Sequence, residues 1–455
     1  MLKFPASMNS LQLPAEVWTH IFAFLSTTDK LSVRASCVFF RKLVDRGCLW
    51  KNSTVFLDFK SGRYNTRFWS SLRRRKVSSV VVSSVKQRDW RQLAVCLPAL
   101  TTIVMDRACQ SCIMHLKDFH HLKRLSVRSR PCDRSTVFQS LPVSQLNKLT
   151  HLSMCGVTFP FKSPVEFQST FSQFAHLTSL SNHCTGLQIF KDAESIIHCT
   201  VSCLPQLEHL SLCLLSVHGP SDGVDQLHSK TALSSLELVN CSDVLLTEDM
   251  MKTLPGLRNL TVFYNRSDKM QWKQSCHLQT WLCDLSNLSS LVVVNGPHVK
   301  KYGAFIPATV TTLGLYVCGL SSEEMNAVAL QVPNLLHLHM VPWPSVCGAQ
   351  TTDLSQLFPK LRSVKIYHLH VPEKFLLKLS EMKNLEHLEI LDDHPDLSKL
   401  VIKLKMLTNH RLRITIRPSS LRDAFLCSCS EKVEQFGQPM NVIGKGIHTL
   451  GLERM

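Results

Sequence analysis

The sequence lacks most of the motifs that mark an enzyme or a membrane protein. It contains no HExxH motif, no glycine-rich phosphate-binding loop and no paired CxxC motifs. No run approaches the ~18 to 20 apolar residues that a helix needs to cross a bilayer, and residues 1–10 lack the apolar segment of a secretory signal. We therefore expect a soluble, non-secreted protein, cytoplasmic or nuclear, that does not bind a membrane and has no catalytic site of its own.

The 18 cysteines are a weak basis for disulfides or a metal site. In a protein without a secretory signal we expect them to stay reduced, and many fall on apolar repeat positions or turns. The CxxC pair Cys109 and Cys112 needs two more ligands to hold zinc, and His115, His120 and His121 are the nearby candidates. We expect no metal and no cofactor.

What the sequence does contain begins with three short amphipathic helices in residues 11–52. Pro14 occupies a first helical position, and apolar residues follow at three- and four-residue steps as far as Leu25. Two further helices are expected before Trp50. A segment of about 40 residues rarely folds alone without disulfides, metal or a partner, so we expect it to be half of an interface.

The order of residues in this segment resembles an F-box motif. The residues that carry the resemblance are Leu13, Pro14, Glu16, Ile21, Phe22, Leu25, Leu31, Cys37, Leu43, Leu49 and Trp50. Phe40 stands where many F-boxes have a tryptophan, which keeps an aromatic at that place. An ordinary N-terminal helical cap on the following domain is the alternative.

The resemblance implies docking onto the small helical Skp-type adaptor of cullin-based ubiquitin ligases. Apolar contact would come from Leu13, Pro14, Ile21, Phe22 and Leu25, and Glu16 would orient the first turn. A proline at a helix start presents a rigid apolar knob, because its φ is fixed and it has no N–H to leave unpaired. We add Leu31, Cys37, Leu49 and Trp50 to the expected adaptor-binding set.

The remainder of the chain is organised by a repeat with apolar residues at positions one, four and six, written LxxLxL. Its mean step is about 25 residues, within the leucine-rich-repeat range. Candidate units start at Val77, Leu100, Leu122, Leu149, Leu177, Leu207, Leu233, Leu257, Leu288, Val310, Leu335, Leu361, Leu385 and Asn409. Positions four and six would point inward from a short strand, and positions two, three, five and seven would point out.

The repeats predict an α/β fold: a short N-terminal three-helix F-box followed by a curved solenoid with parallel strands inside and helices outside. Helix starts are predicted at the capping box formed by Ser321 and Glu324, at Pro372 and at Asp396. Together the parts resemble an F-box and leucine-rich-repeat protein. The expected domains are a flexible N-terminus (1–10), the F-box (11–52), a basic linker (53–76), the solenoid (77–418) and a C-terminal tail or terminal repeat (419–455).

The net charge of +17 is unevenly distributed. Residues 60–91 hold ten Lys and Arg, including Arg73, Arg74, Arg75 and Lys76, against Asp89 alone. Three interpretations remain open for this patch: a solvated linker face, a nuclear-import element, and a surface for nucleic acid or an acidic partner. Nucleic acid is the least favoured of these, because the strands downstream are dominated by Ser and Thr.

Substrate binding is expected on the outward strand positions from about Leu257 onward, where large side chains concentrate. Lys365 and Glu389 are matched in register and could simply neutralise each other. Aromatic side chains beside Arg, Lys and His resemble binding hot spots, so recognition and ladder packing both remain open. The candidate substrate-binding residues are Arg258, Phe263, Tyr264, Tyr316, His337, His339, Lys365, Tyr367 and His368.

The sequence thus predicts a non-catalytic substrate receptor of an SCF-type ubiquitin ligase. The F-box would dock the Skp-type adaptor and the cullin core, and the repeats would recruit a protein substrate that the sequence does not identify. The alternative is a leucine-rich-repeat scaffold or a basic, nucleic-acid-associated protein that never joins a ligase. That alternative rests on the net charge of +17 and on the patch at residues 60–91.

Overall fold

The structure is a computed structural model whose described residues form two compact units, the first up to Val157 and the second from Thr158. The described residues are 13–25, 27–50, 53–60, 64–83, 85–106, 113–128, 136–137, 146–159, 161–183, 187–214, 217, 231–241, 246–264, 276–317, 320–340, 354–367, 371, 373–392 and 397–417. The expected N-terminus at 1–10, the tail at 419–455 and the CxxC pair of Cys109 and Cys112 lie outside them.

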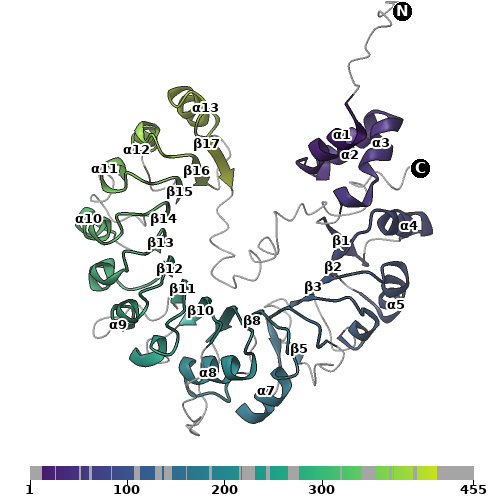
Figure 1. Cartoon of the computed structure of the whole chain (residues 1–455), viewed down its shortest axis with the longest axis horizontal. Coiled ribbons are helices and arrows are strands. Elements are labelled where there is room, and N and C mark those ends of the chain that lie inside the picture. Colours follow the sequence, from purple (N-terminus) through teal and green to yellow (C-terminus); the bar gives the residue numbers. More distant parts are fainter. Residues whose placement is uncertain are drawn as a thin grey trace, which may run out of the picture. The chain divides into compact units, whose positions relative to one another are not determined.

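The first unit opens with the helices that the sequence predicts, and a five-stranded parallel sheet follows (Figure 1). The helical module contains α1 (Ala15–Ala23), α2 (Thr27–Ser36), α3 (Val38–Val44) and the 3-10 turn η1 (Gly47–Leu49). The elements that follow are β1 (Thr54–Asp58), α4 (Thr66–Arg74), β2 (Ser79–Ser83), α5 (Gln87–Cys96), β3 (Thr102–Asp106), η2 (Leu116–Asp118), β4 (Arg124–Arg128), β5 (Thr136–Val137), β6 (His151–Cys155) and β7 (Val157–Thr158).

The second unit is an α/β solenoid of ten parallel strands, β8 to β17 in chain order, with helices on the outer side (Figure 1). Its strands are β8 (Ser179–His183), β9 (His209–Cys213), β10 (Ser235–Cys241), β11 (Asn259–Tyr264), β12 (Ser290–Val294), β13 (Thr312–Tyr316), β14 (His337–Met340), β15 (Ser363–Tyr367), β16 (His387–Leu391) and β17 (Arg413–Arg417). Its helices and 3-10 turns are α7 (Pro164–Phe171), α8 (Ala193–Cys203), η5 (Glu248–Met251), α9 (His277–Asp284), η7 (Val299–Lys301), η8 (Gly303–Phe305), α10 (Ser322–Gln331), α11 (Leu354–Leu357), α12 (Glu373–Lys378), η11 (Leu379–Glu381) and α13 (Ser398–Leu407).

Strand register confirms the repeat pattern and corrects it at both ends. Leu260 and Leu291 occupy position four of neighbouring units and are paired in register, and both are fully buried. The segment expected to be a basic linker contains β1 and α4, so the strands begin at Thr54 rather than at Val77. The last unit starts at Arg411 rather than Asn409, because Arg413 pairs with His387, which occupies position three.

Capping explains where the outer helices begin. The predicted capping box is present on α10, where the Ser321 hydroxyl accepts from the Glu324 backbone N–H at 3.2 Å. The Glu324 carboxylate accepts from the Ser321 N–H at 2.8 Å. These two bonds satisfy donors that a helix start leaves free and fix α10 against the sheet. The expected start at Asp396 lies outside the described residues, and α13 is described from Ser398.

Candidate functional site

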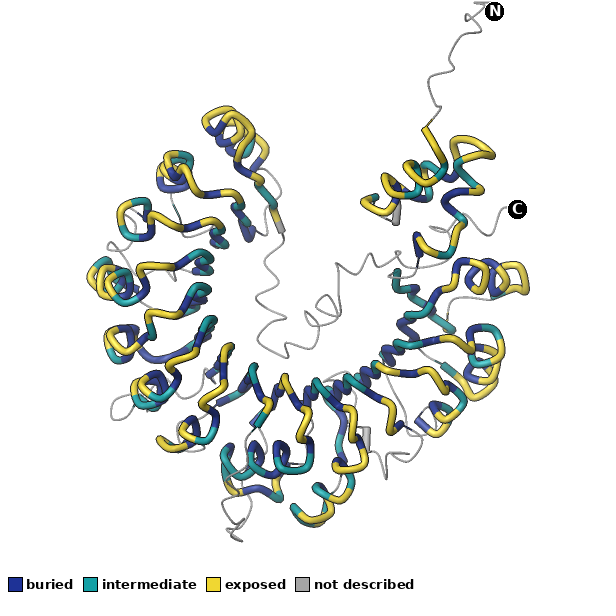
Figure 2. Tube along the Cα trace, viewed as in Figure 1, coloured by how far each residue is buried: buried dark blue, intermediate teal, exposed yellow. Residues whose placement is uncertain are grey.

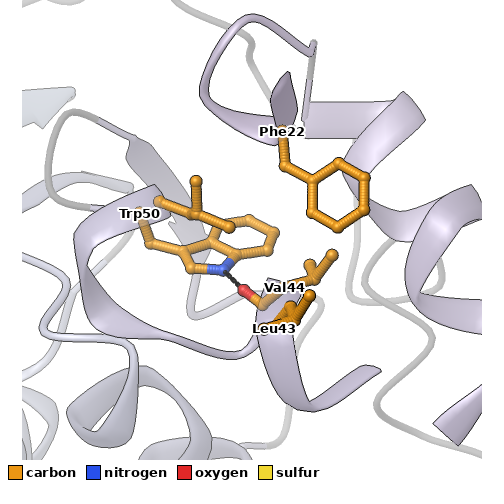
Figure 3. Packing of buried hydrophobic residues seen from close by; sticks show 5 residues of the cluster. Phe22, Leu43, Val44 and Trp50 are labelled. Carbon is orange, nitrogen blue, oxygen red and sulfur yellow. Dashed lines mark hydrogen bonds between the residues drawn. The ribbon is translucent and has the colours of Figure 1, made fainter. Parts of the chain in front are cut away.

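The helical module divides its apolar side chains between a core and a surface. Figure 3 shows four core side chains, Phe22, Leu43, Val44 and Trp50, turned toward one another. The Trp50 indole N–H donates to the Val44 carbonyl at 2.6 Å, which satisfies the one polar group that this core side chain buries. The module thus has a small core of its own.

A second set of apolar side chains on and beside α1 points away from this core. Leu13, Val17, Ile21 and Phe24 are 44, 40, 39 and 78% exposed. Spacings of four, four and three residues place the last three on one side of the helix and Leu13 one turn before them. An apolar stripe left uncovered on a helix of a small module is the geometry of a docking face.

Several residues of the expected adaptor-binding set therefore belong to the core. Phe22, Leu49 and Trp50 are at most 6% exposed, and Leu31 packs against the same cluster. These side chains hold the module together, and those of Phe22, Leu49 and Trp50 are covered by it, whereas Leu31 is half-buried. Leu13, Pro14, Glu16 and Ile21 are exposed, and Leu25 is half-buried.

Cys37 has a local structural role. It is exposed at the N-cap of α3, where its thiol accepts from the Phe40 N–H at 3.4 Å. The expected adaptor-binding set omits four exposed apolar residues of the module, Val17, Phe24, Val38 and Phe39. The three- and four-residue spacing from Leu13 would have identified Val17 and Phe24 as members of the same helix face.

A buried ionic cluster joins the module to α4. The Asp45 carboxylate lies 2.9 Å from the Arg34 guanidinium and 2.8 Å from that of Arg75, and their side chains are 13, 9 and 1% exposed. The Arg75 guanidinium also lies over the Trp50 ring, 4.4 Å from its centroid. Burial alone would raise the pKa of Asp45, but the hydrogen bonds and charges of Arg34 and Arg75 hold it below its usual value.

This cluster changes the interpretation of the basic patch at residues 60–91. Arg75 is an internal ion-pair partner, whereas Arg73 and Arg74 are exposed. The patch aromatics Phe68, Trp69 and Trp90 are at most 3% exposed. They offer no stacking platform, which single-stranded nucleic acid recognition uses.

The inner face of the second unit brings several of the expected substrate-binding residues together. The register places Phe263, Val294 and Tyr316 side by side on β11, β12 and β13. Phe263 and Tyr316 are half-buried. The expectation for Tyr264 is wrong, because its side chain is 5% exposed and packs within the core.

A second row occupies position five of β13 to β17, from Gly314 to Thr415. His339, Lys365 and Glu389 are adjacent in this row, and the Lys365 ammonium lies 3.4 Å from the Glu389 carboxylate. Burial, with a smaller contribution from the charge of Lys365, lowers the pKa of His339 to about 4. His339 is therefore neutral at physiological pH, and the row carries little net charge.

The other expected residues lie elsewhere. Arg258 is exposed and lines a shallow cavity of about 420 Å³ with Gly256, Asn287 and Ser289. His337 is half-buried at position three of β14. The Tyr367 side chain and His368 lie outside the described residues.

One histidine and serine pair on the inner face is covered. His183 and Ser211 share a hydrogen bond of 2.7 Å, but they are 6 and 3% exposed, so a substrate has no access to the serine hydroxyl. Within the described residues there is no group of three or more His, Cys, Asp or Glu that could hold a metal ion. The segment 219–223, GPSDG, has the GxSxG spacing that sequence reasoning overlooked, and it lies outside the described residues.

Among the described helices, none has the length and apolar character required to span a bilayer.

Comparisons with known proteins identify the helical module. Residues 10–55 match the F-box-like family model, which covers α1 to η1 and reaches the start of β1. The comparison with curated proteins gave no match. The solved structure titled "Crystal structure of TLR13-ssRNA13 complex" is similar at 16% identity and a TM-score of 0.39, a likeness too weak to carry an argument. The alignment covers 82% of this chain and 55% of that one, so the chain spans about half the length of that neighbour.

The chain therefore carries an F-box-like domain ahead of an α/β solenoid of leucine-rich-repeat type. This architecture is typical of adaptor proteins that bind other proteins.

Proposed function

We propose that this protein is the substrate-recognition subunit of an SCF-type ubiquitin ligase. The F-box-like module docks the Skp-type adaptor and through it the cullin core, and the inner face of the repeats recruits a protein substrate for ubiquitin transfer by neighbouring subunits. The protein then works in the cytoplasm, the nucleus or both.

The observation that carries this proposal is the uncovered stripe of Leu13, Val17, Ile21 and Phe24 on a module that matches the F-box-like family. Covering these side chains removes apolar surface from water at about 25 cal/mol per Å². The core residues Phe22 and Trp50 would act indirectly, by holding the stripe in place.

Co-purification from cells tests the proposal. We expect the intact chain to retain a Skp-type adaptor and a variant with Leu13→Ala and Pro14→Ala to lose most of it. A matched control is Val95→Ala on α5, which removes an apolar side chain that is 76% exposed elsewhere in the same unit. Retention of the adaptor by the double variant at the wild-type level would contradict the proposal.

Substrate recruitment needs a second experiment. Proximity labelling is compared between the intact protein and a version lacking the F-box-like module. Substrates of a ligase should accumulate as labelled proteins when the module is absent, because recruitment continues while ubiquitin transfer stops. Unchanged abundance of every labelled protein would argue for a scaffold outside any ligase.

A further inference from the structure

The last helix of the second unit has an unusual outer face. On α13, Ile402, Met406 and Leu407 are 58, 68 and 56% exposed. The other outer helices described in this unit expose at most one large apolar side chain each, as at Val165 on α7 and Leu330 on α10. Figure 2 shows the outward side of α13 as exposed.

Two of these side chains, Ile402 and Met406, form a stripe with cations on both sides, and Leu407 lies beyond Lys403 on the same helix. Ile402 and Met406 are four residues apart, so they lie one above the other on the helix. At 3.6 residues per turn, Lys399 and Lys403 fall on one side of this pair and Lys405 on the other. All three lysines are exposed.

The local charge is of one sign. Residues 397–417 contain three Lys and three Arg and no Asp or Glu. The ion pair of Lys403 is a contact of 3.9 Å to Glu373 on α12, with both side chains more than half exposed. Such a pair contributes little and leaves the cation free to meet a partner.

The strand beneath α13 is also uncovered. β17 is the last strand in the sheet order of the described residues, and Ile416 at position six is 40% exposed although this position is buried in the preceding units. A repeat at the end of an array ordinarily presents a polar face. The last of the described repeats presents an apolar and cationic face instead, which indicates a surface that a partner covers.

We propose that the exposed face of α13, defined by Lys399, Ile402, Lys403, Lys405, Met406 and Leu407 and called here the terminal surface, docks an acidic amphipathic helix of a partner protein. The apolar stripe of such a helix would pack on Ile402 and Met406, and its flanking carboxylates would meet the lysines on each side. The proposal does not depend on the ligase role, because it concerns binding by the chain alone.

Charge and geometry select this occupant over others. A second copy of the chain would bring two surfaces of the same charge together, which disfavours self-association. Nucleic acid would set phosphates against the apolar centre of the face. An anionic membrane would use the same charges, so retention on phosphatidylserine vesicles is measured as a separate outcome of the test.

Residues 418–455 are a further candidate occupant. They contain four Lys or Arg and four Asp or Glu, so they carry no net charge to complement the terminal surface. Charge complementarity therefore favours an acidic partner over the chain itself.

The test measures binding of three labelled peptides of about 18 residues, long enough for five helical turns, to the purified full chain by fluorescence anisotropy. The first peptide is helical and amphipathic with Leu in the stripe and Glu on both sides. The second has the same composition in scrambled order, and the third carries Lys in place of Glu. We expect the first to bind at least about tenfold more tightly than either of the others.

Substitutions then locate the binding site. Ile402→Ser with Met406→Ser should weaken binding of the acidic peptide at least about tenfold, because the stripe loses its apolar contact. Lys399→Glu with Lys403→Glu should weaken it similarly and should also create affinity for the Lys peptide. Matched controls are Leu330→Ser on α10 and Lys374→Glu with Lys378→Glu on α12, all exposed positions. Melting temperatures within a few degrees of wild type would show that the variants are folded.

Several results would overturn the proposal. One is failure of the acidic peptide to bind the full chain, as expected if the chain covers its own α13. A second is binding that the substitutions on α13 leave unchanged. A third is a dimer in light scattering that Ile402→Ser with Met406→Ser makes monomeric. The fourth is retention on phosphatidylserine vesicles that needs Ile402 and Met406 while the peptide does not bind.

Discussion

The F-box-like module and the inner face of β11 to β16 both present large apolar side chains, but they hold them differently. On and beside α1, Val17, Ile21 and Phe24 are 39 to 78% exposed, and the Phe24 ring meets the His20 ring edge-on at 5.1 Å. On the sheet, Phe263 and Tyr316 lie in a row with Val294, and each strand covers the flanks of the next. The helix thus exposes a larger part of each apolar side chain to a partner than the sheet does, where Phe263 and Tyr316 are half-buried.

The charged groups of the two regions differ in the same way. In the module, Asp45 is enclosed between Arg34 and Arg75. On the sheet, Lys365 and Glu389 are 26 and 15% exposed and meet at 3.4 Å. Removing one member of an enclosed ion pair lowers the stability of the fold, because the other charge is then buried without a partner. The pair on the sheet is only half-buried, so water still solvates it in part and its contribution to stability should be smaller.

The largest effect on stability is expected for Arg75→Ala. This change removes one of the two buried cations that neutralise the Asp45 carboxylate, and it also removes the cation that lies over the Trp50 ring. The free energy of unfolding of the first unit should fall by about 3 kcal/mol, measured by urea denaturation. Arg74→Ala is the matched control, because Arg74 reaches the same carboxylate at 3.3 Å from a side chain that is 62% exposed, and it should cost less than about 1 kcal/mol. An equal loss of unfolding free energy in the two variants would contradict the claim that the enclosed Arg75 contributes more to stability than the exposed Arg74.

A smaller, pH-dependent effect is expected for Asp45→Asn. The pKa of Asp45 is lowered in the folded protein, so the carboxylate contributes stability above its unfolded value of about 3.9 and loses it as pH falls through the folded pKa. The variant should be less stable than wild type by about 2 kcal/mol near neutral pH, and the difference should shrink below about pH 4. Thermal unfolding of both proteins across this range measures it. A difference that is constant with pH would contradict the ionic account.

Substitutions on the sheet should affect binding rather than folding. Phe263→Asp with Tyr316→Asp should reduce capture of the proteins that proximity labelling identifies by about tenfold, since the row loses its apolar edge. Adaptor binding should be unchanged, because the substitutions leave the F-box-like module intact. Phe305→Asp on η8 is the control, since Phe305 is 38% exposed and lies outside the strands. Equal loss of capture in the control would show that the inner face has no special role.

The smallest effect is expected for the pair of Lys365 and Glu389. A double-mutant cycle with alanine should give a coupling free energy below about 1 kcal/mol. Lys365 also affects His339, whose pKa is lowered to about 4 mainly by burial and further by the charge of Lys365. Lys365→Met should therefore raise the pKa of His339 toward 6.5, measured by NMR titration. A pKa of His339 that stays unchanged would show that Lys365 does not contribute to it.

Sequence reasoning predicted the repeats well because each unit carries its own local pattern. The strand at Thr54–Asp58 was missed since its unit begins with Asn52 in place of an apolar residue. The last unit was placed two residues early, because Leu412, Ile414 and Ile416 alternate and fit the pattern in either frame. The pairing of β17 with β16 decides which residue is position one of the last unit. This pairing depends on two segments, so the pattern of one segment does not reveal it.

The sites were predicted less well because they depend on contacts between distant residues. The F-box-like helices are apolar on several sides, so the pattern could not separate Phe22 in the core from Ile21 on the surface. Nothing in the run of Arg73 to Lys76 shows that Arg75 meets Asp45, thirty residues earlier. Tyr264 was included as the neighbour of Phe263, although the alternation of β11 places its side chain in the core.

The central claim is that the uncovered stripe of α1 docks a Skp-type adaptor, and a titration of the purified adaptor against the full chain tests it most directly. The account predicts saturable binding that Val17→Asp with Ile21→Asp weakens at least about a hundredfold, while Val95→Asp leaves it unchanged. Absence of binding by the wild-type chain, or equal affinity of the wild type and the double variant, would contradict it.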